Sequence, residues 1–131
     1  MRASGTFEVT DMRPTDWAPD ISTGLPTAHM HLAKTYGGDV EGRSITQFSA
    51  AFDPATGVGT YVAMESFGGS VGGRAGAFNF AHAASTSGTD RTDEYGVVVP
   101  GSGTGELTGI TGTVRLTGPD GHTLELEYEL P

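Results

Sequence analysis

One pair of side chains in this sequence is suited to proton transfer, namely Glu65 and His82. A carboxylate and an imidazole within hydrogen-bond reach of each other can pass a proton to and from a bound substrate. Burial would raise the pKa of Glu65 toward neutral pH, where such a pair works best. The alternative is a buried ion pair with a structural role only. We keep both interpretations and take Glu65 and His82 as the leading catalytic candidates.

Lys34, the only lysine of the chain, is the third catalytic candidate. It could orient an anionic substrate or, if desolvated, form a Schiff base. A buried lysine usually requires a partner, so a salt bridge to Glu65 or Asp39 is the preferred interpretation of this residue.

Two further patterns predict no chemistry. His29 and His31 are spaced as two metal ligands on one face of a strand, but the other elements of a cupin metal site are missing, so we predict no metal. The glycine-rich run 101–105 lacks the lysine and the following helix of a phosphate-binding loop. We therefore predict a turn there, and no cofactor for the protein.

Strands must position these side chains, because the sequence alternates with a period of two and not with a helical period. Residues 123–130 show this best, since apolar residues occupy one face and Thr or Glu the other. The same alternation points His82 inward with two phenylalanines, and Lys34 inward with Met30, while His29 and His31 point outward. On segment 61–67 we favour the inward set that contains both aromatic residues: Tyr61, Ala63, Glu65 and Phe67.

Eight segments have this strand pattern, and they are residues 6–12, 28–36, 43–52, 61–67, 75–83, 95–99, 110–116 and 123–130. Three prolines make 14–26 a loop or lid, and the polar segment 85–93 is also expected to be a loop. Short turns without crossover helices predict an antiparallel meander, and about eight such strands can close into a barrel. The expected fold is thus all-β, a single antiparallel β-barrel domain over 1–131; a two-sheet sandwich is the competing architecture.

Composition limits the partners. The net charge is −9, and the six arginines are scattered, which argues against nucleic acid and against an anionic membrane surface. The chain has no cysteine, which excludes disulfides and thiolate chemistry. It has no apolar run long enough to span a bilayer and no signal-peptide pattern, so we expect a cytoplasmic protein.

Four stretches resemble one bacterial family: 34–42 (KTYGGDVEG), 64–67 (MESF), 73–82 (GRAGAFNFAH) and 98–107 (VVPGSGTGEL). The family is domain of unknown function 3224, and the resemblance extends from Ser4 to Tyr128, with Ser66 where the family usually has arginine. It implies an allene-oxide-cyclase-like β-barrel, a fold that includes cyclases and dirigent-type proteins which steer ring closure or coupling. His29, His31 and the Trp17 loop depart from the family pattern, as expected of a specialised member.

These observations predict a barrel that holds a small apolar metabolite in a reactive conformation, as a cofactor-independent cyclase or isomerase. The alternatives are a non-catalytic lipocalin-like carrier or sensor, and a structural domain with a filled interior. The residues expected to contact the substrate are Tyr36, Tyr61, Phe67, Phe78, Phe80, Met30, Tyr128 and Trp17. Outward apolar residues such as Ile45, Val62 and Met64 also permit a homodimer.

Overall fold

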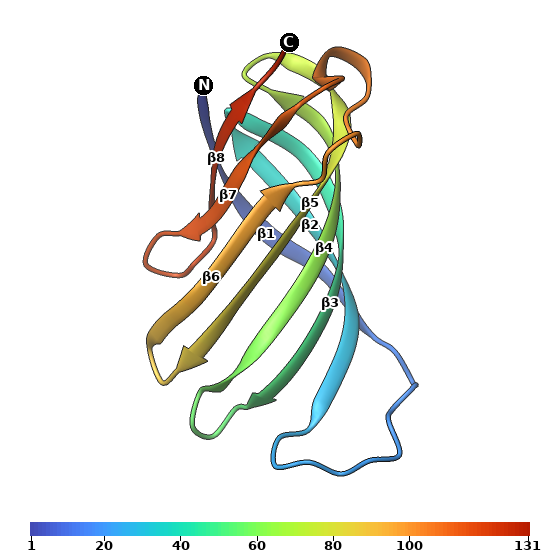
Figure 1. Ribbon diagram of the computed structural model, residues 1–131, viewed down its shortest axis with the longest axis vertical. Helices are drawn as coiled ribbons and strands as arrows, with labels where there is room; N and C mark the ends of the chain where they lie inside the picture. The colour runs from blue at the N-terminus through green and yellow to red at the C-terminus, as the bar shows by residue number, and fades with distance from the viewer.

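The computed structural model describes residues 1–131 and confirms an all-β architecture, in which eight antiparallel strands in chain order close into one barrel (Figure 1). The elements are β1 (Arg2–Pro14), β2 (Thr27–Gly38), β3 (Val40–Asp53), β4 (Val58–Val71), β5 (Arg74–Ser87), β6 (Asp90–Val98), a 3-10 turn η1 (Gly105–Leu107), β7 (Thr111–Thr117) and β8 (Thr123–Glu129). Pairing of β1 with β8 closes the barrel, with Ala3 opposite Leu126. No helix of the structure is both long and apolar enough to cross a bilayer.

All eight expected strands are present, but several are longer than the sequence pattern indicates. The prediction of a loop over 85–93 is wrong, because Ser85 pairs with Thr92 and Ser87 with Asp90 in a β5–β6 hairpin. Polar residues can continue a strand here because backbone hydrogen bonds, and not apolar burial, hold the ends of a hairpin together. Strand β4 also extends beyond the expected segment 61–67, because Gly68 and Gly69 remain within it. The turn to β5 forms at Gly72 and Gly73, both with positive φ.

The two ends of the barrel differ. A cluster of fifteen buried residues fills the end near the chain termini, with Phe67, Phe78 and Phe80 packed in series and Leu124 and Leu126 from β8. At the opposite end, β2 to β6 extend well beyond β7 and β8, and the loop of residues 15–26 lies beside them (Figure 1). Side chains therefore fill the interior at one end only.

The glycine-rich run 101–105 packs against β5 and has no ligand-binding geometry of its own. Thr104 donates its backbone N–H to the carbonyl of Ala77 at 2.8 Å, and Ser102 accepts a hydrogen bond from the backbone of Asn79. This close approach requires glycine at position 76, because a Cβ there would lie 2.1 Å from the carbonyl oxygen of Thr104.

We expect Gly76→Ala to lower the free energy of unfolding by about 1–3 kcal/mol, since the backbone of the 101–105 run must move to admit the methyl group. Gly68→Ala is the matched control, because a Cβ at Gly68 has no neighbour within 4 Å. Urea unfolding of the two variants measures the difference. Equal stabilities would contradict the packing described here.

Candidate functional site

The structure brings the three catalytic candidates together in the middle of the barrel. Lys34 comes from β2, Glu65 from β4 and His82 from β5, and all three point inward as the alternation predicts. Their exposed fractions are 5%, 0% and 5%. Three polar side chains at this depth require partners, since an isolated buried charge is costly.

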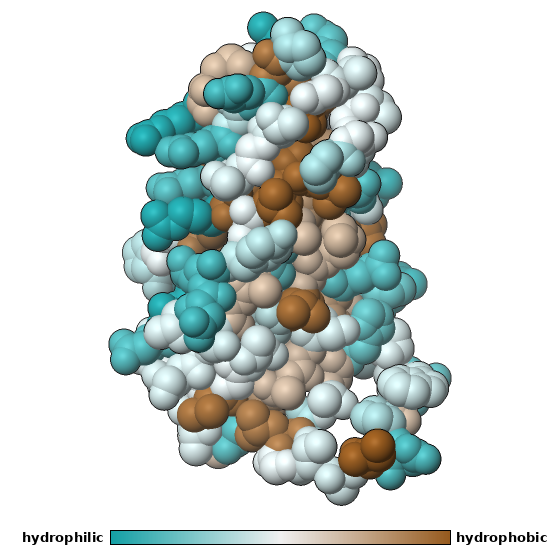
Figure 2. All heavy atoms as spheres, in the orientation of Figure 1, coloured by the Kyte–Doolittle hydropathy of each residue, from teal (hydrophilic) through white to brown (hydrophobic).

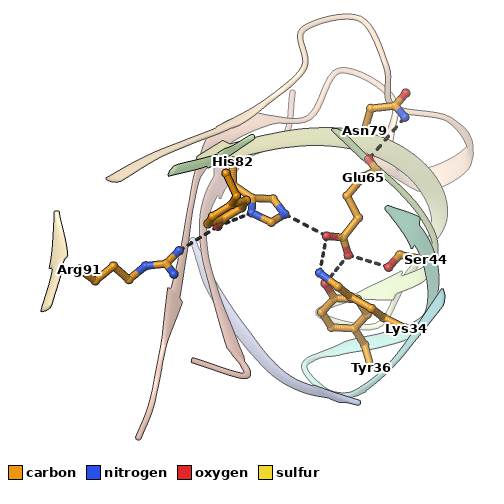
Figure 3. A network of polar contacts seen from close by, with 8 residues as sticks. Lys34, Tyr36, Ser44, Glu65, Asn79, His82 and Arg91 are labelled. Atoms are coloured by element: carbon orange, nitrogen blue, oxygen red, sulfur yellow. Dashed lines mark hydrogen bonds and ion pairs between the residues drawn. The ribbon is translucent and has the colours of Figure 1, made fainter. Parts of the chain in front are cut away.

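The Glu65 carboxylate is the common partner of Lys34 and His82 (Figure 3). Its Oε1 accepts hydrogen bonds from Lys34 Nζ at 2.9 Å and lies 3.1 Å from His82 Nε2. Its Oε2 accepts hydrogen bonds from the hydroxyl of Tyr36 and, at 2.6 Å, from that of Ser44. Lys34 therefore forms the salt bridge to Glu65, whereas the carboxylate of Asp39 accepts a hydrogen bond from the backbone of Ser4.

These contacts keep Glu65 ionised. Burial by itself would raise the pKa of Glu65, but the hydrogen bond from His82, the charge of Lys34 and the two hydroxyl donors outweigh it and lower the pKa to about 2. The expectation that burial moves Glu65 toward neutral pH is therefore wrong, because all of its neighbours stabilise the carboxylate. Burial and the adjacent carboxylate in turn raise the pKa of Tyr36, which stays a hydrogen-bond donor.

A second set of contacts runs from His82 to the barrel end. His82 Nδ1 lies 2.8 Å from the hydroxyl of Tyr61, and Arg91 donates to the same hydroxyl at 2.8 Å. Arg91 is also paired with Glu94 at 2.7 Å. One assignment of protons satisfies every contact: Arg91 donates to Tyr61, Tyr61 donates to His82, and His82 donates to Glu65. Burial raises the pKa of Tyr61, against the opposing effect of Arg91, so its hydroxyl stays neutral.

An apolar cavity of about 330 Å³ lies at the open end of the barrel, next to this chain of hydrogen bonds. Met30, Phe48 and Phe52 contribute much of its apolar wall, and Tyr61 belongs to both the cavity lining and the hydrogen-bond chain. The ring of Phe48 stacks on that of Tyr61 at a centroid distance of 5.3 Å. A molecule in the cavity would thus meet the Tyr61 hydroxyl within a mainly apolar lining that also includes Thr27, Thr60 and Thr86.

The structure places the expected substrate-contacting residues in three different locations. Met30 and Tyr61 line the cavity. The hydrophobic core contains Tyr36, Phe67, Phe78, Phe80 and Tyr128. Trp17 is 78% exposed in the loop of residues 15–26 and lies in a shallow outer groove together with Pro19 and His29.

His29 and His31 point to the outside of the barrel, as the alternation predicts, away from Glu65 and His82. The Nδ1 atom of His29 lies 2.7 Å from the hydroxyl of Ser49. These two histidines therefore have no geometric link to the buried network.

Three residues of the site did not emerge from the sequence pattern: Ser44, Phe48 and Arg91. Ser44 and Phe48 are on the inward face of β3, and extending the alternation to residues 43–52 would have pointed both of them inward. Arg91 lies in the segment expected to be a loop. It is paired with Thr86 in the β5–β6 hairpin, and no local pattern indicates its contact with Tyr61.

The chain belongs to the family described as a protein of unknown function, DUF3224, whose model matches residues 3–130. Among solved structures it is similar to a protein of unknown function of this family from Shewanella oneidensis MR-1. The two are 30% identical, the match covers 100% of this chain and 97% of that one, and the TM-score is 0.87. No curated protein matches the sequence.

Proposed function

We propose that this protein binds a small, mostly apolar molecule in the cavity at the open end of the barrel and isomerises or cyclises it by proton transfer. One observation carries the proposal: Tyr61 lines the apolar cavity and is hydrogen-bonded to His82, which is bonded to the buried Glu65. A cavity that is largely apolar with a few convergent polar groups is typical of small-molecule sites. The resemblance to allene-oxide-cyclase-like barrels supports ring closure as one form of this chemistry.

In the proposed reaction, the oxygen of Tyr61 takes a proton from an acidic C–H bond of the substrate as the Tyr61 proton moves to His82 Nδ1. Glu65 holds the imidazole by its other nitrogen and stabilises the imidazolium that forms, without itself being protonated. Return of the proton through Tyr61 to a different carbon completes an isomerisation with no net gain or loss of protons. Arg91 stabilises negative charge on the Tyr61 oxygen meanwhile.

A second candidate, a non-catalytic carrier of an apolar metabolite, is favoured by the state of Glu65. The Glu65 carboxylate makes hydrogen bonds to four side chains of the protein, and its pKa is lowered to about 2. A network of this kind could simply hold the barrel together beside a binding cavity. The two candidates share the cavity and differ in whether His82 moves a proton.

Binding is tested with N-phenyl-1-naphthylamine, an uncharged fluorophore whose emission rises in apolar surroundings. We expect saturable binding to the wild type and at least about a tenfold loss of affinity in Ala50→Trp, whose new side chain would fill the cavity. Ala51→Trp is the matched control, because Ala51 is the next residue of β3 and lies outside the cavity lining. Equal loss in both variants, or no binding by the wild type, would refute the cavity as a binding site.

Catalysis is tested with 5-nitrobenzisoxazole, a small apolar carbon acid that opens when a base removes its C–H proton. Wild-type protein should accelerate this opening, and His82→Gln should reduce the acceleration by about 10²-fold or more. N-phenyl-1-naphthylamine binding by His82→Gln should persist, which separates a lost base from a lost cavity. Equal rates for the wild type and His82→Gln, with binding retained in both, would favour the carrier.

A further inference from the structure

The outer surface of the barrel has one wall without charged side chains. It consists of the outward-facing residues of β2 (27–33), β3 (45–51), β4 (60–66) and β5 (79–85), with Tyr95 and Val97 of β6. None of them is Asp, Glu, Lys or Arg, although the chain has 16 acidic and 7 basic residues. We call this surface the uncharged wall.

The uncharged wall is also unusually apolar for an exposed sheet. Val62 is 55% exposed, Tyr95 59%, and both Met64 and Ile45 42%. Cross-strand pairing places them close together, since Val62 is opposite Ala83 and Ala83 is opposite Tyr95. In Figure 2, pale and brown residues run along the middle of the visible face, with hydrophilic residues on both sides.

Six polar side chains of the wall bond to one another in pairs. His29 pairs with Ser49 at 2.7 Å, Thr60 with Ser85 at 2.7 Å, and Asn79 donates to Ser66 at 2.8 Å. Covering these six side chains leaves their hydrogen bonds intact, so the desolvation cost of an interface here comes mainly from Thr27, His31 and Gln47. A largely apolar surface with most of its polar side chains paired to one another is suited to contact with protein more than to contact with water.

We propose that the uncharged wall binds the same wall of a second copy of this chain, forming a twofold-symmetric dimer. The charge distribution selects this partner: two chains of net charge −9 repel each other, and the wall is where they can meet without placing like charges opposite. The wall has four outward residues on each of β2 to β5 and two on β6, spaced about 5 Å across the strands and about 7 Å along them, which gives a flat area of roughly 600 Å². That is close to the ~800 Å² that each partner contributes to a standard interface.

Sedimentation equilibrium tests the dimer. The wild type should have a mass of twice 13.5 kDa, and Met64→Glu should shift it to a single chain, because the glutamates would face one another across the interface. Met12→Glu is the matched control, since Met12 is a 57% exposed methionine on β1 whose cross-strand partner is the inward-facing Leu32. Met12 therefore lies on the opposite face of the sheet from the wall, and the variant should remain dimeric. A wild type that sediments as one chain at every soluble concentration would overturn the proposal.

A second wall variant, Val62→Glu, covers the case in which Met64→Glu does not fold, as judged by far-UV circular dichroism. It should also sediment as a single chain, and a cooperative thermal melting transition should show that it is folded. A dimer that persists in both folded wall variants, or one that Met12→Glu disrupts equally, would place the interface elsewhere and overturn the assignment.

Discussion

Glu65→Gln is expected to lower the free energy of unfolding by about 3–5 kcal/mol, the typical cost of leaving a buried charge without its partner. The substitution keeps the size of the side chain, removes its charge and replaces one acceptor oxygen with an amide NH2 donor. Lys34, at 5% exposure, then has no carboxylate within reach, and Tyr36 and Ser44 lose an ionic acceptor. For a chain of this length the loss corresponds to a fall in melting temperature of about 10–20 °C. Thermal and urea unfolding measure it.

Glu94→Gln is the matched control for this prediction. Glu94 pairs with Arg91 and Arg115 at the surface with 33% of its side chain exposed, so the same substitution should cost less than about 1 kcal/mol. Adding Lys34→Met to Glu65→Gln removes the uncompensated cation and should recover part of the loss. If Glu65→Gln costs no more than Glu94→Gln, the buried network does not stabilise the barrel.

Acid should weaken the folded protein through the same carboxylate. The pKa of Glu65 is about 2 in the folded chain against an ordinary value of 4.5, so its contribution is complete above pH 4.5 and is lost as the pH falls toward 2. The difference corresponds to about 3 kcal/mol of stability. Unfolding free energies measured in urea at several pH values between 7 and 2 should show this decline in the wild type.

The double variant Lys34→Met/Glu65→Gln is the reference for that pH series. It lacks the titrating group, so its stability should decline less steeply over the same range, by about the contribution of Glu65. The other carboxylates, such as Asp11 beside Arg13, are present in both proteins. Parallel curves for the two proteins would show that Glu65 is not the group whose protonation weakens the fold.

Alternation in the sequence is sufficient to predict which way side chains face, because the period of two follows from strand geometry alone. It therefore placed Lys34, Glu65 and His82 inside the barrel and His29 and His31 outside. It does not determine how far along the barrel each inward residue lies, since that depends on register and on where the sheet closes. Phe78 and Phe80 thus belong to the core, whereas Phe48 lines the cavity.

The ionised state of Glu65 could also not be predicted from the sequence. Burial alone favours the neutral acid, and only the three-dimensional placement of Lys34, Tyr36, Ser44 and His82 around one carboxylate reverses that preference. The contact of Arg91 is equally invisible in the sequence, because its partner Tyr61 is 30 residues away on β4 while Arg91 is on β6. Long-range contacts between polar side chains leave no periodic signal in a single sequence.

Methionine methyl NMR tests most directly the proposed binding of a small apolar molecule at the open end of the barrel. The chain has 4 methionines, of which Met30 lines the cavity while Met12 and Met64 lie outside its lining. On titration with N-phenyl-1-naphthylamine, the methyl signal of Met30 should shift through the ring current of the bound fluorophore, with those of Met12 and Met64 unchanged. A shift of Met12 or Met64 with Met30 unmoved, or no shift at all, would contradict the account.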